Sequence, residues 1–100
     1  MIAIVSVVPI GKEALSRDVS TVIDIIDKSG LDYRLTAMGT IIEGDPDEVW
    51  GLIRQCHDKM KERANRVHTQ ITIDDRKDAQ GSIRSKVADI EQHLSRKLKT

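Results

Sequence analysis

Two hydroxyl groups and one carboxylate are the polar side chains of this sequence whose surroundings suggest chemistry. Ser6 is the only polar residue in the apolar run Ile2–Val8, and Thr40 and Glu43 stand in another short apolar segment. A hydroxyl in a buried strand is costly unless it has a hydrogen-bond partner. Ser6 and Thr40 therefore either form internal hydrogen bonds or make a polar patch in an apolar cleft, the usual anatomy of a small-molecule site. Glu43 is either a surface charge or helix cap, or the carboxylate of that site.

The single cysteine and the three histidines do not have the spacing of a metal site or of an activated nucleophile. Cys56 and His57 are adjacent on a predicted helix, so their side chains point about 100° apart. His68 and His93 belong to other predicted elements. The sequence also lacks the GxGxxG, GxxxxGKS/T and GxSxG motifs. We therefore expect no metal, no cofactor and no catalytic residue, and a packing role for Cys56.

Composition limits the class of protein. The 100 residues contain 16 Lys and Arg, 16 Asp and Glu, one Trp and one Tyr, so we expect no nucleic-acid partner. One cysteine excludes an intrachain disulfide. The apolar run at residues 2–8 is shorter than the ~20 residues that span a bilayer, and no Lys or Arg precedes it. We expect a buried strand there, no membrane contact, a single domain over residues 1–100 and a cytoplasmic protein.

The spacing of apolar residues predicts four strands. Residues 2–8 are apolar on both faces, which is typical of a central strand. Strands are also expected over residues 33–37, 40–43 and 67–73. The last of these alternates apolar and polar residues, as a strand at a sheet edge does.

Three helices are expected between and after these strands, over residues 17–29, from 46 to about 64 and from 82 to about 97. Ser16 is the predicted N-cap of the first helix, and Gly30 is its predicted stop. Asp45, Pro46 and Glu48 predict a capping box at the start of the second.

The order β-α-β-β-α-β-α predicts an α+β fold. Its simplest form is a ferredoxin-like βαββαβ sandwich with a four-stranded antiparallel sheet and an added C-terminal helix. The first and third strands are then central, and the second and fourth are edges. Two helices cover only one face of the sheet, so the third helix or another subunit must cover the opposite face.

The third helix and the end of the fourth strand are candidate assembly elements. The helix has a narrow apolar seam, so we expect Val87 and Leu94 at a subunit interface; packing on its own sheet is the alternative. Arg76 follows two aspartates at the end of an edge strand. We expect it at a subunit contact or at the rim of a site, and a solvated turn is the alternative. The seam consists of Ile83, Val87, Ile90, Leu94 and Leu98.

Several segments, in their order and spacing, resemble the small prokaryotic thiamine-binding family. The segment Met38–Gly44 is the most specific, because Gly39, Thr40, Glu43 and Gly44 occur together at fixed spacing. The resemblance spans nearly the whole chain, although Ile10 stands where leucine is more usual. The segments are Ser6–Gly11, Ser29–Tyr33, Met38–Gly44, Ile73–Arg76 and Lys86-Val87.

This resemblance implies a ferredoxin-like subunit that forms dimers and tetramers, binds thiamine or its hydroxymethylpyrimidine moiety, and has no catalytic activity. The residues are compatible with that ligand. Ser6, Thr40 and Glu43 could pair with the amine and ring nitrogens of an aminopyrimidine, and a thiazolium cation would favour a carboxylate such as Glu43.

Two other functions compete with ligand binding. One is an oligomeric regulatory or scaffold module that uses the sheet as an interface and has no thiamine role. The other is a small hydrolase of acylphosphatase type, which needs an arginine and an asparagine over a phosphate loop. The only asparagine, Asn65, lies at a predicted helix end, which argues against the hydrolase.

Overall fold

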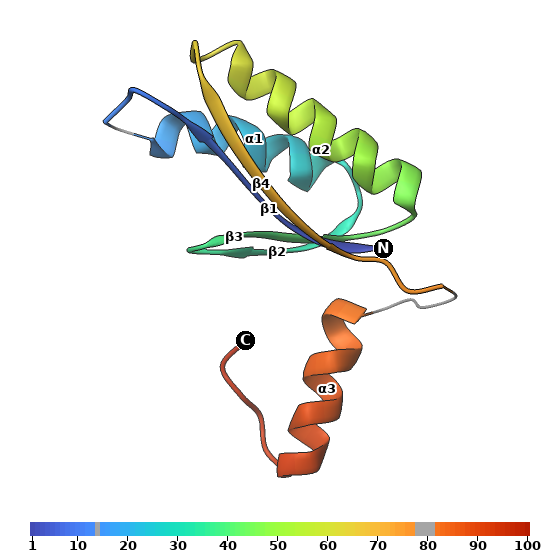
Figure 1. Ribbon diagram of the computed structural model, residues 1–100. Helices are drawn as coiled ribbons and strands as arrows, with labels where there is room; N and C mark the ends of the chain where they lie inside the picture. Colours follow the sequence, from blue (N-terminus) through green and yellow to red (C-terminus); the bar gives the residue numbers. More distant parts are fainter. Residues whose placement is uncertain (14, 78–81) are drawn as a thin grey trace.

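The protein is an α+β sandwich whose computed structural model describes residues 1–13, 15–77 and 82–100. The strands are β1 (Ile2–Pro9), β2 (Asp32–Thr36), β3 (Gly39–Glu43) and β4 (Val67–Asp74), and the helices are α1 (Ser16–Lys28), α2 (Pro46–Lys61) and α3 (Ser82–Leu94). The antiparallel sheet has the order β2-β3-β1-β4 (Figure 1). The predicted ferredoxin-like order is therefore confirmed, with β1 and β3 in the centre.

The register of the sheet divides its residues between two faces. Val5 lies opposite Thr40 on β3 and Ile71 on β4, while Ile4 lies opposite Ile41 and Thr72. Residues directly opposite each other share a face. The Val5 side is covered by α1 and α2, and we call the Ile4 side the open face. Figure 1 shows α1 and α2 on one side of the sheet and α3 on the other.

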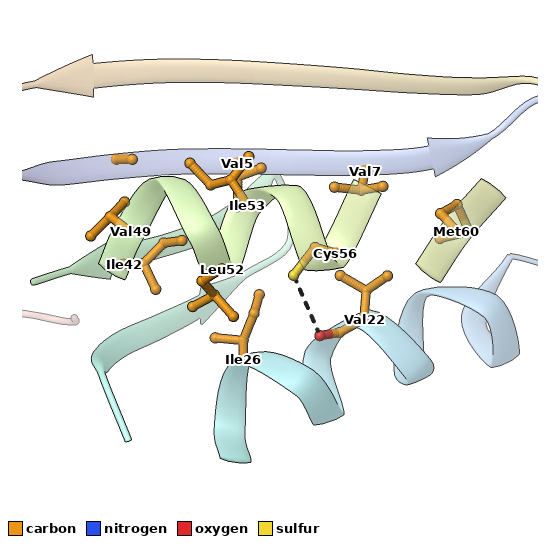
Figure 2. Close-up of a cluster of buried hydrophobic side chains, with 11 residues drawn as sticks. Val5, Val7, Val22, Ile26, Ile42, Val49, Leu52, Ile53, Cys56 and Met60 are labelled. Carbon is orange, nitrogen blue, oxygen red and sulfur yellow. Dashed lines mark hydrogen bonds between the residues drawn. The ribbon is translucent and has the colours of Figure 1, made fainter. Parts of the chain in front are cut away.

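The core lies between the sheet and the two covering helices (Figure 2). Apolar residues that recur with the helical period give α1 and α2 one buried stripe each, as predicted. The Cys56 Sγ lies 4.0 Å from the Val22 carbonyl oxygen, at the contact of the two helices. The residues of this core are Ala3, Val5, Val7, Val22, Ile26, Ile42, Val49, Leu52, Ile53, Cys56 and Met60.

The helix starts differ in detail from the prediction. Helix α1 begins at Ser16 with Leu15 as its N-cap, so Ser16 is in the first turn, where its carbonyl accepts the Ser20 hydroxyl at 2.6 Å. Asp45 is the N-cap of α2 and Pro46 follows it, but the Asp45 side chain forms no capping hydrogen bond. The N-terminus of α2 is therefore correct and the capping box is wrong.

Two helix ends are also shorter than predicted. Helix α2 ends at Lys61, three residues before the predicted end. Helix α3 ends at Leu94 because Ser95 has a positive φ of 55°, which reverses the chain direction. The backbone N–H of Leu98 then donates to Glu91 at 2.7 Å. Leu98 is consequently outside the helix, and its predicted place on the seam is wrong. The predicted stop at Gly30 is confirmed by its φ of 81°.

Helix α3 is held at its first turn and then leaves the sheet (Figure 1). Ile83 is buried, and its backbone N–H donates to a Glu43 carboxylate oxygen at 3.2 Å. Arg84 forms an ion pair with Asp32 of β2. Farther along the helix, Ile90 is 53% exposed. The chain is therefore longer than a compact globule: its radius of gyration is 14.9 Å, against about 13 Å for 100 residues.

Among the described residues, no helix is long and apolar enough to cross a membrane.

Helix α3 does not cover the open face of the sheet. Of the two covers that the sequence predicted for this face, the third helix or another subunit, the third helix is therefore not the one.

Candidate ligand-binding site

A small apolar pocket lies where α1 crosses the end of the β2–β3 hairpin. Its volume is about 180 Å³, below the roughly 300–1,000 Å³ of sites for drug-sized ligands. The walls are residues 5–8 of β1, four apolar residues of α1 and residues 35–40 of the hairpin. We call this the hairpin pocket. Its size suits one ring of a ligand rather than a whole two-ring molecule.

The pocket exists because β1 is longer than its neighbour. Strand β1 pairs with β4 over all eight residues, but with β3 only over Ile2–Val5. Past Val5, no described strand pairs with β1 on the β3 side, so the backbone of residues 6–8 has polar groups that face the pocket region. Gly39 brings the hairpin close at this point: a Cβ there would lie 3.1 Å from the Val5 carbonyl oxygen.

Thr40 is the polar side chain buried in this pocket. It is 3% exposed and lies beside Val5 on the helix-covered face. Its hydroxyl has no hydrogen-bond partner among the described residues. The described chain contains no fully enclosed side-chain nitrogen or oxygen without a partner, so this hydroxyl must retain contact with the pocket space. The Thr40 hydroxyl, which can both donate and accept a hydrogen bond, is therefore available to a ligand inside an apolar cavity.

Ser6 contributes to the same pocket from its edge. It follows Val5 on β1, is half-buried and lines the pocket beside Thr40. Because side chains alternate along a strand, Ser6 is directed to the open face, where it also lines a shallow hollow with Ile4 and Gln70. The structure therefore brings Ser6 and Thr40 to one pocket, although the two side chains belong to opposite faces of the sheet.

Glu43 lies elsewhere. It is opposite Ile2 at the far end of β3, on the open face, and it does not line the hairpin pocket. Its carboxylate accepts the Ile83 N–H at the start of α3, where negative charge is favourable. The sequence alone separates the two residues: Thr40 and Glu43 are three apart, and residues an odd number apart on a strand point to opposite faces. A ligand-binding role for Glu43 stays a prediction.

The predicted interface residues are on the surface. Arg76 is exposed beyond the end of β4, Val87 is half-buried, and Leu94 is 46% exposed on α3. These positions leave all three available to a second molecule, and their roles stay predictions.

Two other groups that sequence analysis could have marked as reactive are structural. The Arg63 guanidinium donates to Asp18 at 2.6 Å, and Lys12 lies 3.3 Å away, so the pKa of this buried carboxyl falls below 3.8. Burial raises the pKa of the Cys56 thiol to about 11, which keeps it protonated at neutral pH. The packing role of Cys56 is confirmed. The described residues contain no cluster of three or more potential metal ligands.

A larger hollow of about 560 Å³ lies between α1 and α2, but it is a wide groove rather than an enclosed pocket. Its walls include Lys28, Asp47 and Glu48, all exposed. The hairpin pocket is the better candidate site because it combines an apolar lining with a buried hydroxyl that has no partner.

The order of the strands and the hairpin pocket together define a class of protein: a ferredoxin-like domain with a buried hydroxyl group in a small apolar cavity. Comparison with known proteins then gives the family. The chain belongs to the thiamine-binding protein family, whose model matches residues 3–91. The resemblance identified in the sequence is confirmed.

Relatives occur in archaea and bacteria. The UPF0045 protein MJ1052 of Methanocaldococcus jannaschii is 35% identical over 88 residues, which cover 87% of this chain and 88% of that protein. The UPF0045 protein YqgV of Bacillus subtilis is 34% identical over 100 residues, covering 93% and 96%.

Solved structures agree with the fold. The crystal structure of the M. jannaschii protein matches with a TM-score of 0.83 at 34% identity, over 91% of this chain and 95% of that one. A proposed thiamine biosynthesis or salvage protein of Thermotoga maritima has a TM-score of 0.80 at 22% identity, over 89% and 96%. At that identity the match demonstrates a shared fold.

Proposed function

We propose that this protein binds thiamine or its hydroxymethylpyrimidine moiety, without catalysis, and that the hairpin pocket holds the pyrimidine ring. The observation that carries the proposal is the hydroxyl of Thr40, a residue that is 3% exposed, which lies in an apolar pocket without a partner among the described residues. Family membership supports the choice of ligand. The alternative function, a regulatory or scaffold module that binds no ligand, does not explain why this hydroxyl is buried.

The chemistry of an aminopyrimidine matches what the pocket offers. The ring has an exocyclic amine that donates and ring nitrogens that accept. Thr40 can both donate and accept, whereas Ser6 lies at the edge of the pocket with its hydroxyl directed to the open face. The backbone of residues 6–8 adds N–H and C=O groups along one strand edge. At about 180 Å³ the pocket fits one ring, so in thiamine the thiazolium would stay outside, toward solvent.

Calorimetric titration of the purified protein with thiamine and with hydroxymethylpyrimidine tests this function. A ligand at 100 times its Kd stabilises the folded state by about 2.7 kcal/mol, which raises the melting temperature by roughly 10–20 °C. Toluene, a ring of similar size without polar groups, is the control and should give no comparable shift. The absence of both heat and thermal shift with millimolar thiamine and hydroxymethylpyrimidine would overturn the proposal.

We also propose that the functional form is a homodimer or homotetramer. The support is apolar surface that the single chain leaves uncovered: Ile90 and Leu94 on α3, and Ile4 on the open face. Burial of each such side chain contributes about 1.5–3 kcal/mol when it is complete, enough to stabilise an association.

The double substitution Val87→Asp with Leu94→Asp should shift the molecular mass by light scattering toward that of one chain. Ser85→Asp with Ala88→Asp is a control that adds the same two negative charges at exposed positions of α3 and leaves the apolar seam intact. A folded Val87/Leu94 variant with the mass of the unmodified protein would refute the role of α3.

A further inference from the structure

We infer that the hairpin pocket accepts only an uncharged ligand group, so that the protein binds hydroxymethylpyrimidine and rejects its phosphate esters. This inference rests on the proposed function and adds a selectivity to it. The observation is the composition of the walls: none of the described residues that line the pocket is Lys, Arg, His, Asp or Glu.

Three cations close in the chain to the pocket-lining residues are directed or held elsewhere. Lys28, at the end of α1, forms an ion pair with Asp24 at 2.8 Å. Arg34 of β2 lies opposite Ile41, and therefore on the open face. Lys12 contacts the buried Asp18. A phosphate in the pocket would find no counter-charge, and desolvating a dianion without one is strongly unfavourable.

The backbone cannot replace a missing cation. Residues of an extended strand present N–H and C=O groups together along the edge. At residues 6–8 of β1, a phosphate that approached an N–H would also approach carbonyl oxygens, which repel it. The same alternation suits a neutral heterocycle with a donor beside an acceptor. The alternation of N–H and C=O groups along this strand edge therefore favours the aminopyrimidine and disfavours the phosphate dianion.

The phosphate ester is a stringent probe because its charge is close to the ring. In hydroxymethylpyrimidine phosphate, one methylene and one oxygen separate phosphorus from the ring, so a ring inside the pocket holds the phosphate at its wall. A protein with this selectivity retains the free alcohol and releases the product of phosphoryl transfer to that alcohol.

The test compares binding of hydroxymethylpyrimidine and of its monophosphate by calorimetry. We expect the ester to bind the unmodified protein about 100-fold more weakly or worse. Leu35 offers a gain of function, because it lines the pocket, lies directly opposite Thr40 and is 60% exposed. Leu35→Lys should place an ammonium beside the ligand and improve ester binding roughly tenfold, with a gain that shrinks as salt is raised.

Two control variants separate the effect of adding a positive charge from the effect of where it is added. Leu35→Gln changes the same side chain without adding charge, and Gln55→Lys adds the same charge on α2, outside the pocket. Neither should improve ester binding. If Leu35→Lys does not fold by circular dichroism, Met38→Lys takes its place, because Met38 also lines the pocket and is 85% exposed.

The possible results differ in what they overturn. Equal affinity of the unmodified protein for alcohol and ester overturns the selectivity and leaves the binding function standing. Improved ester binding by Gln55→Lys as large as that by Leu35→Lys also overturns it, since position would then not matter. No binding of the alcohol, the ester or thiamine overturns the proposed function and this inference with it.

Discussion

Replacing Thr40 with valine should make the protein more stable and a weaker binder at once. Valine has the shape of threonine but lacks the hydroxyl, so the substitution removes a single polar group without creating a cavity. Thr40 is 3% exposed, and its hydroxyl has no partner among the described residues. Burial of such a hydroxyl costs about 1–3 kcal/mol. We expect the low end, about 1 kcal/mol, because the group still contacts the pocket space.

The two effects can be measured separately. A gain of about 1 kcal/mol raises the melting temperature of a domain this size by roughly 4–8 °C. In the complex, the lost hydroxyl leaves a ligand atom unpaired, which costs about 1–3 kcal/mol, or roughly a 5- to 150-fold rise in Kd. Thermal unfolding without ligand and calorimetry with thiamine give these numbers.

Thr69 supplies a matched control on the same face of the sheet. Its hydroxyl lies 2.6 Å from His57 Nδ1, so it does have a partner. Thr69→Val should therefore lower stability by about 1 kcal/mol and leave the affinity for thiamine unchanged. If Thr40→Val lowers stability in the same way, the Thr40 hydroxyl has an internal partner and the reasoning is wrong. Unchanged affinity in Thr40→Val would remove Thr40 from the site.

Three further substitutions test single contacts. The Arg63 hydrogen bond lowers the pKa of Asp18 in the folded state, so this pair stabilises the fold above pH 3.8. The contribution is lost as the pH falls through the folded-state pKa. Asp18→Asn should therefore flatten that part of the stability–pH curve measured by urea unfolding. Glu43→Gln tests the predicted ligand-binding role of Glu43 and should weaken thiamine binding. A variant with unchanged affinity, in which only the protection of the Ile83 amide in hydrogen exchange changes, would limit Glu43 to the α3 contact. Arg76→Ala should alter oligomer stability or ligand affinity, and a variant equal to the parent in light scattering and calorimetry would make Arg76 an ordinary surface residue.

The sheet and its helices could be predicted from the sequence, because they depend on the periodicity of apolar residues. A run that is apolar on both faces, as in β1, is typical of a strand in the centre of a sheet, and β1 lies there. The stripes of α1 and α2 fix which side of each helix meets that sheet. The alternation along β4 marks an edge, and the register confirms that β4 lies there. Each of these features is local, so the order of residues suffices.

The residues that form the pocket and the direction of α3 depend on contacts between distant segments, so they could not be predicted from the sequence. Ser6 and Thr40 share a pocket because β1 extends past the end of β3, and strand overlap depends on register between distant segments. Glu43 meets α3 through a contact 40 residues apart in sequence. The apolar seam of α3 predicts a helix with one buried face, but the seam has the same spacing whether it packs on its own sheet or on another chain. The direction of the helix is set by contacts at its first turn, which the seam does not encode.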